Sequence, residues 1–209
     1  MALMGKSISV KAGAARVGLN QAEPRGHRQL FTGTISVSGV SENLCGAKRP
    51  GHFNGVCTVV TKLFNLSEAD RAYFGQKDAQ QLAVVRRMVR DLNANIEIVG
   101  CPIIREEDGL AKSSRNTYLG ADERKAAVVL SKALKKGKEM IEAGEKNADA
   151  VKSEIISMIL EEPLAKIDYV EITDWNSIEP VDIIENSILC AVAVYIGKTR
   201  LIDNFIYEV

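Results

Sequence analysis

The sequence lacks the features that mark several common classes of protein. No apolar run approaches the roughly 18 residues of a membrane-spanning helix, so the given sequence predicts no such helix. Neither sign of charge is in excess, because 27 lysines and arginines balance 27 aspartates and glutamates, and aromatic residues make up only 5% of the chain. This balance argues against a nucleic-acid or anionic-membrane partner. We therefore expect no nucleic-acid partner and no membrane partner.

Cysteine motifs are also absent. The four cysteines (Cys45, Cys57, Cys101 and Cys190) lie far apart with no C-x-x-C pair, so the sequence predicts no zinc or other metal site. Three of them sit inside apolar runs, where a thiol behaves as a small hydrophobic group. Unpaired cysteines indicate a reducing, cytoplasmic setting.

Residues 1–34 differ from the rest of the chain. Five lysines and arginines face a single acid, Glu23, and no helical or strand period is sustained. We expect this segment to be disordered. An organellar transit peptide is the less favoured alternative, because no amphipathic arginine stripe is present.

Residues 35–102 alternate between strand and helix patterns. Apolar residues recur at intervals of three and four in the two helical segments, and in short runs in the strands. Such alternation predicts a parallel sheet with crossover helices. The expected elements are strands 35–40, 71–74 and 96–104 and helices 53–66 and 78–93.

Residues 103–209 have a different order of elements, with helices first and strands after them. This order predicts a smaller α+β domain, with a boundary near Pro102 and an antiparallel sheet. Gly197 and Lys198 favour a tight hairpin between the last two strands. The expected helices are 121–143 and 148–160, and the expected strands are 167–173, 187–196 and 200–207.

Lys77 stands where a predicted strand passes into a helix. A helix N-terminus carries free N–H groups and partial positive charge, so a lysine beside it can complete an anion site. The alternative is an ordinary solvated lysine on a turn. Asp78 and Gln81 fit the N-cap and third position of the same helix, which explains both without a ligand. A cap at the carboxyl edge of a sheet also faces the crevice where ligands bind.

The segment from Asp108 to Asn116 contains Ser113, Ser114 and Arg115. Two hydroxyls followed by a guanidinium can donate several hydrogen bonds to phosphate oxygens, but the segment can also be only a polar turn. Arg49 and His52 precede a predicted helix. Arg49 can pair with a carboxylate substrate or with a surface acid. For His52, a capping or packing role is commoner than a catalytic one.

From residue 35 to the C-terminus the chain resembles the pantothenate synthetase (pantoate–β-alanine ligase) family. The resemblance rests on five blocks in the family's order, namely residues 44–53, 73–82, 98–102, 108–116 and 197–204. It implies an α/β fold in which an incomplete Rossmann-like nucleotidyl-transferase domain (residues 35–102) precedes a smaller α+β lid domain (residues 103–209). It also implies a homodimer.

The implied activity is the ATP-dependent condensation of pantoate with β-alanine through pantoyl adenylate, with Mg²⁺, in coenzyme A biosynthesis. By position, Lys77 and Arg115 are the catalytic candidates. The implied ATP contacts are Gly75 and Asp78 at the ribose, the Ile104 backbone at the adenine, and Lys77, Lys112, Ser113, Ser114 and Arg115 around the phosphates. The implied substrate contacts are Gln81 for pantoate, and Arg49 and His52 near the substrate end.

Two departures from the family's pattern stand out. Lys112 occupies a position where many members carry methionine, which adds a cation beside the phosphate loop. The family's first strand, its Pro-Thr-Met-Gly segment and its His-x-Gly-His motif are not found, and His27 has no second histidine three residues away. Residues 1–34 do not resemble the family. The sequence therefore suggests a lost start, and the alternative function is a truncated, inactive remnant that keeps only dimerisation or weak nucleotide binding.

Overall fold

The computed structural model describes residues 33–209 and the backbone of residues 7–10. Two units divide the chain: Met1–Gly75 together with Gln80–Cys101 form the first, and Gln76–Ala79 together with Pro102–Val209 form the second. Most of segment 1–34, including His27, lies outside the described residues. The expectations of disorder and of a transit peptide concern that part of the chain.

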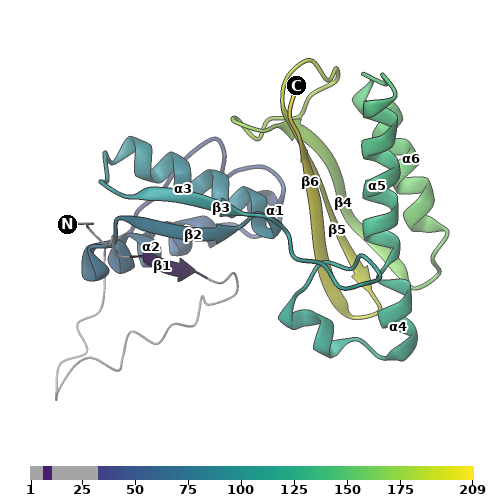
Figure 1. The fold of residues 1–209 in the computed structure, drawn as a ribbon, viewed down its shortest axis with the longest axis horizontal. Helices are drawn as coiled ribbons and strands as arrows, with labels where there is room; N and C mark the ends of the chain where they lie inside the picture. Colours follow the sequence, from purple (N-terminus) through teal and green to yellow (C-terminus); the bar gives the residue numbers. More distant parts are fainter. Residues whose placement is uncertain (1–6, 11–32) are drawn as a thin grey trace, which may run out of the picture. The chain divides into compact units, whose positions relative to one another are not determined.

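A three-stranded parallel sheet forms the centre of the first unit, in the order β1-β2-β3 (Figure 1). Strand β1 (Ser7–Val10) pairs with β2 (Arg71–Gly75), which pairs with β3 (Glu97–Cys101). The predicted parallel sheet is thus confirmed in β2 and β3. No period in residues 1–34 predicts β1, which extends the sheet by one strand on the other side of β2.

Two helices cross between these strands. Helix α2 (His52–Ser67) follows a single-turn helix α1 (Cys45–Lys48), and α3 (Ala79–Asp91) follows β2. Each presents apolar residues at three- and four-residue intervals to the core, as the sequence predicts. The two helices meet where Thr61 Oγ1 lies 3.3 Å from Met88 Sδ. The buried residues of the unit include Phe53, Cys57, Val60, Phe64, Ala72, Phe74, Leu82, Val85 and Met88.

The predicted strand 35–40 is wrong. These residues join no β-ladder, and the Ile35 N–H donates instead to the Thr58 hydroxyl of α2 at 2.9 Å. At the end of the segment, Gly39 and Val40 enter a turn. Ile35 and Val37 are partly buried while Ser36 and Ser38 are exposed. The alternation in the sequence therefore reflects packing of one side of the segment and not pairing with a strand.

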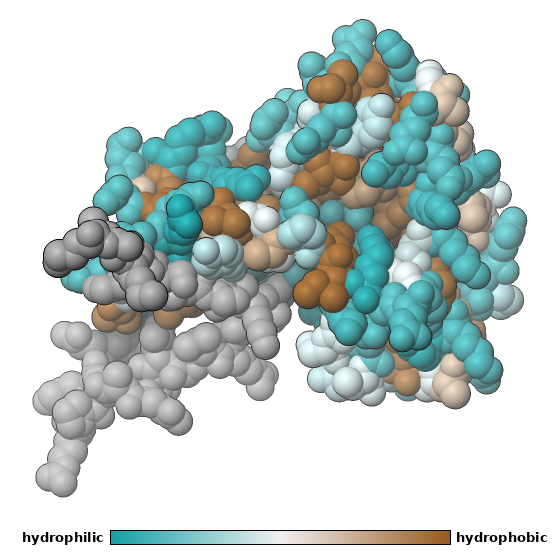
Figure 2. All heavy atoms as spheres, in the orientation of Figure 1, coloured by the Kyte–Doolittle hydropathy of each residue, from teal (hydrophilic) through white to brown (hydrophobic). Residues whose placement is uncertain are grey.

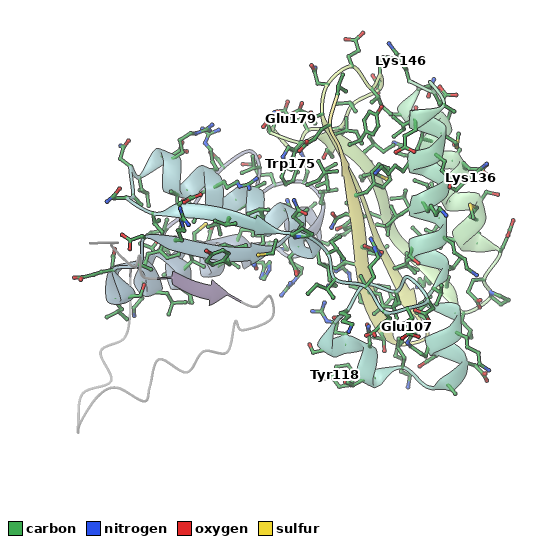
Figure 3. The ribbon with its side chains drawn as sticks, viewed as in Figure 1. Glu107, Tyr118, Lys136, Lys146, Trp175 and Glu179 are labelled. Atoms are coloured by element: carbon green, nitrogen blue, oxygen red, sulfur yellow. The ribbon has the colours of Figure 1, made fainter. Side chains whose placement is uncertain are left out.

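The second unit is built on an antiparallel sheet in the order β4-β5-β6. Strands β4 (Ala165–Asp174), β5 (Ile188–Ile196) and β6 (Thr199–Tyr207) match the three predicted strands closely. Gly197, with φ of +56°, opens the predicted hairpin between β5 and β6. The single tryptophan, Trp175, lies in the segment after β4 (Figure 3).

Helices α5 (Val129–Glu142) and α6 (Ala148–Leu160) pack with this sheet around one core. Every second residue of β5 from Ile188 to Ile196 belongs to that core. The helices approach closely at Gly137, where an added Cβ would lie 2.5 Å from Ile155 Cδ1. On the face shown in Figure 2, hydrophilic side chains dominate the exposed surface of this unit.

The sequence predicts one helix over 121–143, but the structure contains two. Helix α4 (Ala121–Ala126) ends before α5 begins at Val129, with a turn at Ala127 and Val128. No glycine or proline marks this break. Ala127 is fully buried. The break therefore coincides with packing of this turn into the core, and no helix-breaking residue is needed at that point.

Candidate functional site

Lys77 lies at the centre of a short 3-10 turn, Gln76–Asp78, between β2 and α3. The turn leads directly into Ala79, so Lys77 stands beside the positive end of the α3 helix dipole. The side chain of Asn204, from β6, donates from Nδ2 to the carbonyl oxygens of Gln76 at 3.0 Å and Lys77 at 2.9 Å. The turn is therefore held by the second unit, to which it belongs.

The segment after β3 forms a small hairpin that ends at the predicted phosphate loop. Arg105 and Ala111 form an antiparallel bridge, and the Lys112 N–H donates to the Ile104 carbonyl at 2.9 Å. Gly109, with φ of +94°, closes the turn and its N–H donates to the Glu106 carbonyl. A positive φ of this size favours glycine, which explains the Asp-Gly pair in the sequence.

Two arginine–carboxylate pairs fix this hairpin. Arg124 of α4 contacts both oxygens of Asp108 at 2.7 and 3.1 Å, and lowers the pKa of that exposed carboxyl. Arg105 contacts both oxygens of Asp203 at 2.7 and 3.1 Å. The Asp203 side chain is 2% exposed and that of Arg105 is 34% exposed. The second pair therefore links the hairpin to the interior of the unit.

The Ser-Ser-Arg segment follows the hairpin as a 3-10 helix, Ser114–Tyr118. Its cap is Ser113, whose Oγ accepts from the Arg115 N–H at 3.2 Å. The Asn116 side chain donates to the Ala111 carbonyl at 3.1 Å. These contacts give the predicted phosphate loop a defined conformation, since both its ends are tied by side-chain hydrogen bonds.

One recess of the second unit brings the two predicted phosphate-binding segments together. It is small and open, with about 10 Å³ of accessible space, and Lys77, Ser113 and Arg115 all line it. These three residues come from segments more than 30 positions apart in the sequence. The other lining residues are Leu110, Ala111, Asn116, Leu130, Arg200, Leu201, Ile202 and Asp203.

The recess carries an excess of positive charge. Its one acid, Asp203, is engaged by Arg105, and its third cation, Arg200, pairs with Asp168 at 2.8 Å. Lys77 and Arg115 form no ion pair with any other residue that the structure describes. Two cations and a hydroxyl that line one hollow are suited to an anion with several oxygens, such as a phosphate chain.

The remaining predicted ATP contacts are not among the lining residues. Lys112 points its ammonium to Glu106, 3.7 Å away, and Ser114 accepts from the Thr117 hydroxyl through its carbonyl. The Ile104 side chain is 70% exposed, and its carbonyl is occupied by the Lys112 N–H. Asp78 directly precedes α3, which is the capping position expected for it.

Four further candidates belong to the first unit. Gly75 ends β2, opposite Cys101 of β3, and Gln81 is partly buried in the first turn of α3. Arg49 and His52 contact one another, with 3.2 Å between Nη1 and Nε2. The roles assigned to these residues from the sequence stay predictions.

The sequence missed the buried residues that support the recess. Asp203 and Asn204 are both almost fully buried in β6, at 2% and 4% exposure. The available signal was the pair of adjacent polar residues in an otherwise largely apolar predicted strand, which suggests that at least one of them is buried with a partner. Their partners, Arg105 and Lys77, lie 98 and 127 residues away, so sequence spacing alone could not reveal them.

Neither of the two buried cysteines, Cys57 and Cys190, lines the recess. Burial raises the pKa of Cys57 to about 11 and also raises that of Cys190, so both are inert thiols of the core. Among residues 33–209, no group of three or more His, Cys, Asp or Glu residues could hold a metal ion. The same residues contain no helix long and apolar enough to cross a membrane.

Comparison with known proteins identifies relatives of the whole described chain. The family model for pantoate-beta-alanine ligase matches residues 23–206. The match begins before residue 35, so residues 23–34, which were not expected to resemble the family, fall within it. Pantothenate synthetase of Clostridium acetobutylicum is 63% identical over 175 residues, which cover 84% of this chain and 62% of that protein.

Solved structures agree with this match. The crystal structure of pantothenate synthetase from Thermus thermophilus superposes with a TM-score of 0.81 at 42% identity, and covers 85% of this chain and 64% of its own. Pantoate-beta-alanine ligase from Francisella tularensis, complexed with β-γ ATP and β-alanine, gives a TM-score of 0.58 at 32% identity, over 83% of this chain and 58% of its own. The predicted fold class, a Rossmann-like α/β domain followed by an α+β domain with an antiparallel sheet, is confirmed.

The chain spans about 62% of the length of the curated relatives that it matches. Within that span the family model covers nearly all of the described residues. The chain belongs to the pantoate–beta-alanine ligase family.

Proposed function

We propose that this chain carries out the ATP-dependent ligation of pantoate to β-alanine, through a pantoyl-adenylate intermediate. The observation that carries the proposal is the convergence of Lys77, Ser113 and Arg115 on one positively charged recess. A pantoate carboxylate oxygen attacks the α-phosphorus of ATP, and the bond to the β-phosphate breaks with release of pyrophosphate. The amine of β-alanine then attacks the acyl carbon, and AMP leaves.

Lys77 and Arg115 are the catalytic residues of this proposal. Lys77 lies beside the start of α3, where it can hold phosphate oxygens and stabilise the charge that develops at the α-phosphorus. Arg115, with the Ser113 hydroxyl, binds the departing pyrophosphate from the other wall of the recess. Ser114 and Lys112 are assigned weaker phosphate contacts, and Lys112 must first leave Glu106 to make one.

The other ligand groups fall to residues outside the recess. Asp78, the last residue of the Lys77 turn, and Gly75, which precedes the turn, are assigned to the ribose. The Ile104 backbone is assigned to the adenine. The Ile104 carbonyl already accepts from the Lys112 N–H. The Ile104 N–H is therefore the group assigned to an adenine nitrogen. Gln81 is assigned a hydrogen bond to pantoate, and Arg49 and His52 are assigned further substrate contacts.

Mg²⁺ enters this proposal with the nucleotide. Phosphate oxygens and water are the ligands that Mg²⁺ commonly keeps in nucleotide sites. Its contribution is neutralisation of phosphate charge. The second unit acts as a lid that keeps water from the acyl adenylate, and the assembly is a homodimer.

Release of AMP by the purified chain tests the function. The chain is incubated with ATP, Mg²⁺, pantoate and β-alanine, with each substrate omitted in turn, and AMP and pantothenate are quantified by chromatography. We expect both products only in the complete mixture. Lys77→Ala lowers the rate by about 10²–10³, the usual effect of removing a group that stabilises developing charge.

Two outcomes contradict the proposal. AMP formed without pantoate points to nucleotide hydrolysis and not to ligation. Binding of ATP without any AMP assigns this chain the alternative function, nucleotide binding without catalysis. The His-x-Gly-His motif that the sequence does not contain is the specific reason to run the binding measurement beside the kinetic one.

A further inference from the structure

The side chain of Asn204 makes an unusual pair of contacts. It is 4% exposed in β6, and its single Nδ2 atom donates to two successive carbonyl oxygens, those of Gln76 and Lys77, at 3.0 and 2.9 Å. Both amide hydrogens are thus used on one turn. Among the protein side chains of this length, only an asparagine amide places two donors on one nitrogen at this distance from the backbone.

These two contacts determine where the Lys77 side chain begins. A three-residue 3-10 helix has poor hydrogen-bond geometry of its own, so the turn depends on support from outside. Holding the Gln76 and Lys77 carbonyls fixes the two peptide planes on either side of the Lys77 Cα. The long lysine side chain then leaves from a fixed Cα, and fewer of its conformations point away from the recess.

Asn204 itself is held in place by its neighbour. The Asn204 N–H donates to Asp203 Oδ1 at 2.8 Å, and the same carboxylate binds Arg105 of the hairpin. Two adjacent residues of β6 therefore hold the Lys77 turn and the hairpin that leads into Ser113. One strand thus sets the spacing between the two walls of the recess.

We propose that Asn204 is a positioning residue that places the Lys77 ammonium for the phosphates of ATP. The proposal rests on the proposed function of the recess for its ligand, but the placement of Lys77 can be measured without any ligand. Removing the amide frees the turn, and the Lys77 amine then samples solvent more often.

Acylation of Lys77 measures this placement directly. The purified chain is treated briefly with an amine-acylating reagent, and modification of Lys77 is followed by peptide mass spectrometry relative to the exposed Lys135. We expect faster modification of Lys77 in Asn204→Ala than in the wild type. Asn204→Leu, which fills the volume without a donor, gives the same result if the alanine variant does not fold. Unchanged Lys77 reactivity in a folded variant overturns the proposal.

A double-mutant cycle with ATP separates positioning from a general loss of structure. Asn204→Ala should raise the Kd for ATP by about tenfold. A change of that size is expected when the charge-assisted contact between Lys77 and the phosphates is weakened. In the Lys77→Ala background the same change should have no further effect, because the group that Asn204 positions is gone. An equal, additive loss in both backgrounds contradicts the proposal.

Asn147 supplies the matched control. It caps α6 by accepting from the Ala150 N–H at 2.9 Å, so Asn147→Ala costs the second unit stability without touching the Lys77 turn. We expect unchanged Lys77 reactivity and ATP affinity in this variant. If Asn147→Ala shifts them as much as Asn204→Ala does, a structural role for Asn204 suffices and the positioning role is refuted. If the wild type binds no ATP, the proposed function fails, and the acylation result alone decides on Asn204.

Discussion

The ion pair between Arg105 and Asp203 allows a quantitative test of how the recess is supported. The pair joins an almost fully buried carboxylate, 2% exposed, to a guanidinium that is 34% exposed. Removing Arg105 leaves a buried carboxylate without its cation, whereas removing Asp203 leaves a guanidinium that still reaches water. We predict that replacing the arginine destabilises the second unit more than replacing the aspartate does.

The asymmetry follows from what each variant leaves behind. Arg105→Met leaves a buried carboxylate with the Asn204 N–H as its remaining contact, and such an orphaned charge costs about 3–5 kcal/mol. Asp203→Asn leaves a guanidinium that reaches water and still donates to the Gly109 carbonyl at 3.0 Å. That change weakens hydrogen bonds without burying a charge and costs about 1–2 kcal/mol.

Urea unfolding followed by Trp175 fluorescence measures both values. Trp175 is the only tryptophan of the chain and lies in the second unit, so its signal reports that unit. The matched control is Lys138→Met, which breaks an exposed pair with Glu142 at 3.6 Å and should cost no more than about 0.5 kcal/mol. Equal losses for the two pair variants, or a larger loss for Asp203→Asn, refute the reasoning.

Two other predictions follow from packing and from burial. Gly137→Ala should destabilise the second unit by about 1–3 kcal/mol in the same urea assay, because its Cβ would overlap Ile155. Gly55→Ala in α2 of the first unit meets nothing within 4 Å and should stabilise that unit by up to about 1 kcal/mol, as measured by circular dichroism during urea unfolding. A destabilising Gly55→Ala or a neutral Gly137→Ala contradicts this. Cys57 has a pKa near 11 in place of 9.0, so its thiolate fraction at pH 8 is about a hundredfold lower than that of an unperturbed thiol. It is also buried, and should therefore react with iodoacetamide at pH 8 far more slowly than the partly exposed Cys101. The fold favours the neutral thiol, so this contribution to stability is present below pH 9 and is lost as the pH rises toward 11. Equal labelling of the two thiols in the folded chain is the result that would count against it.

Sequence periodicity predicted a helix or strand correctly where the spacing of buried side chains matches the hydrogen bonding of the backbone. Strand β6 was predicted at 200–207 and spans Thr199–Tyr207, and α6 was predicted with its observed bounds. Segment 35–40 has the same alternation as a strand, but its backbone partner is the Thr58 hydroxyl. A sequence cannot distinguish one-sided packing on a helix from pairing in a sheet, because both bury every second residue.

The same limit applies to the recess. Lys77, Ser113 and Arg115 could be found because cations and hydroxyls at a strand–helix junction and in a glycine-bounded loop have a direct use in phosphate binding. Asp203 and Asn204 could not, because their role is defined by partners that folding brings together from distant positions. The sequence thus reveals groups that touch a ligand more readily than groups that hold those residues in place.

The affinity of the chain for ATP tests the central claim most directly. Equilibrium titration of the wild type, Lys77→Ala and the control Lys135→Ala with ATP and Mg²⁺ compares a lysine of the recess with one that pairs with Glu139 on the surface of α5. The account predicts binding by the wild type, unchanged affinity in Lys135→Ala, and a Kd raised by about ten- to hundredfold in Lys77→Ala. Equal affinities for all three proteins would contradict it, because ATP would then bind without the recess.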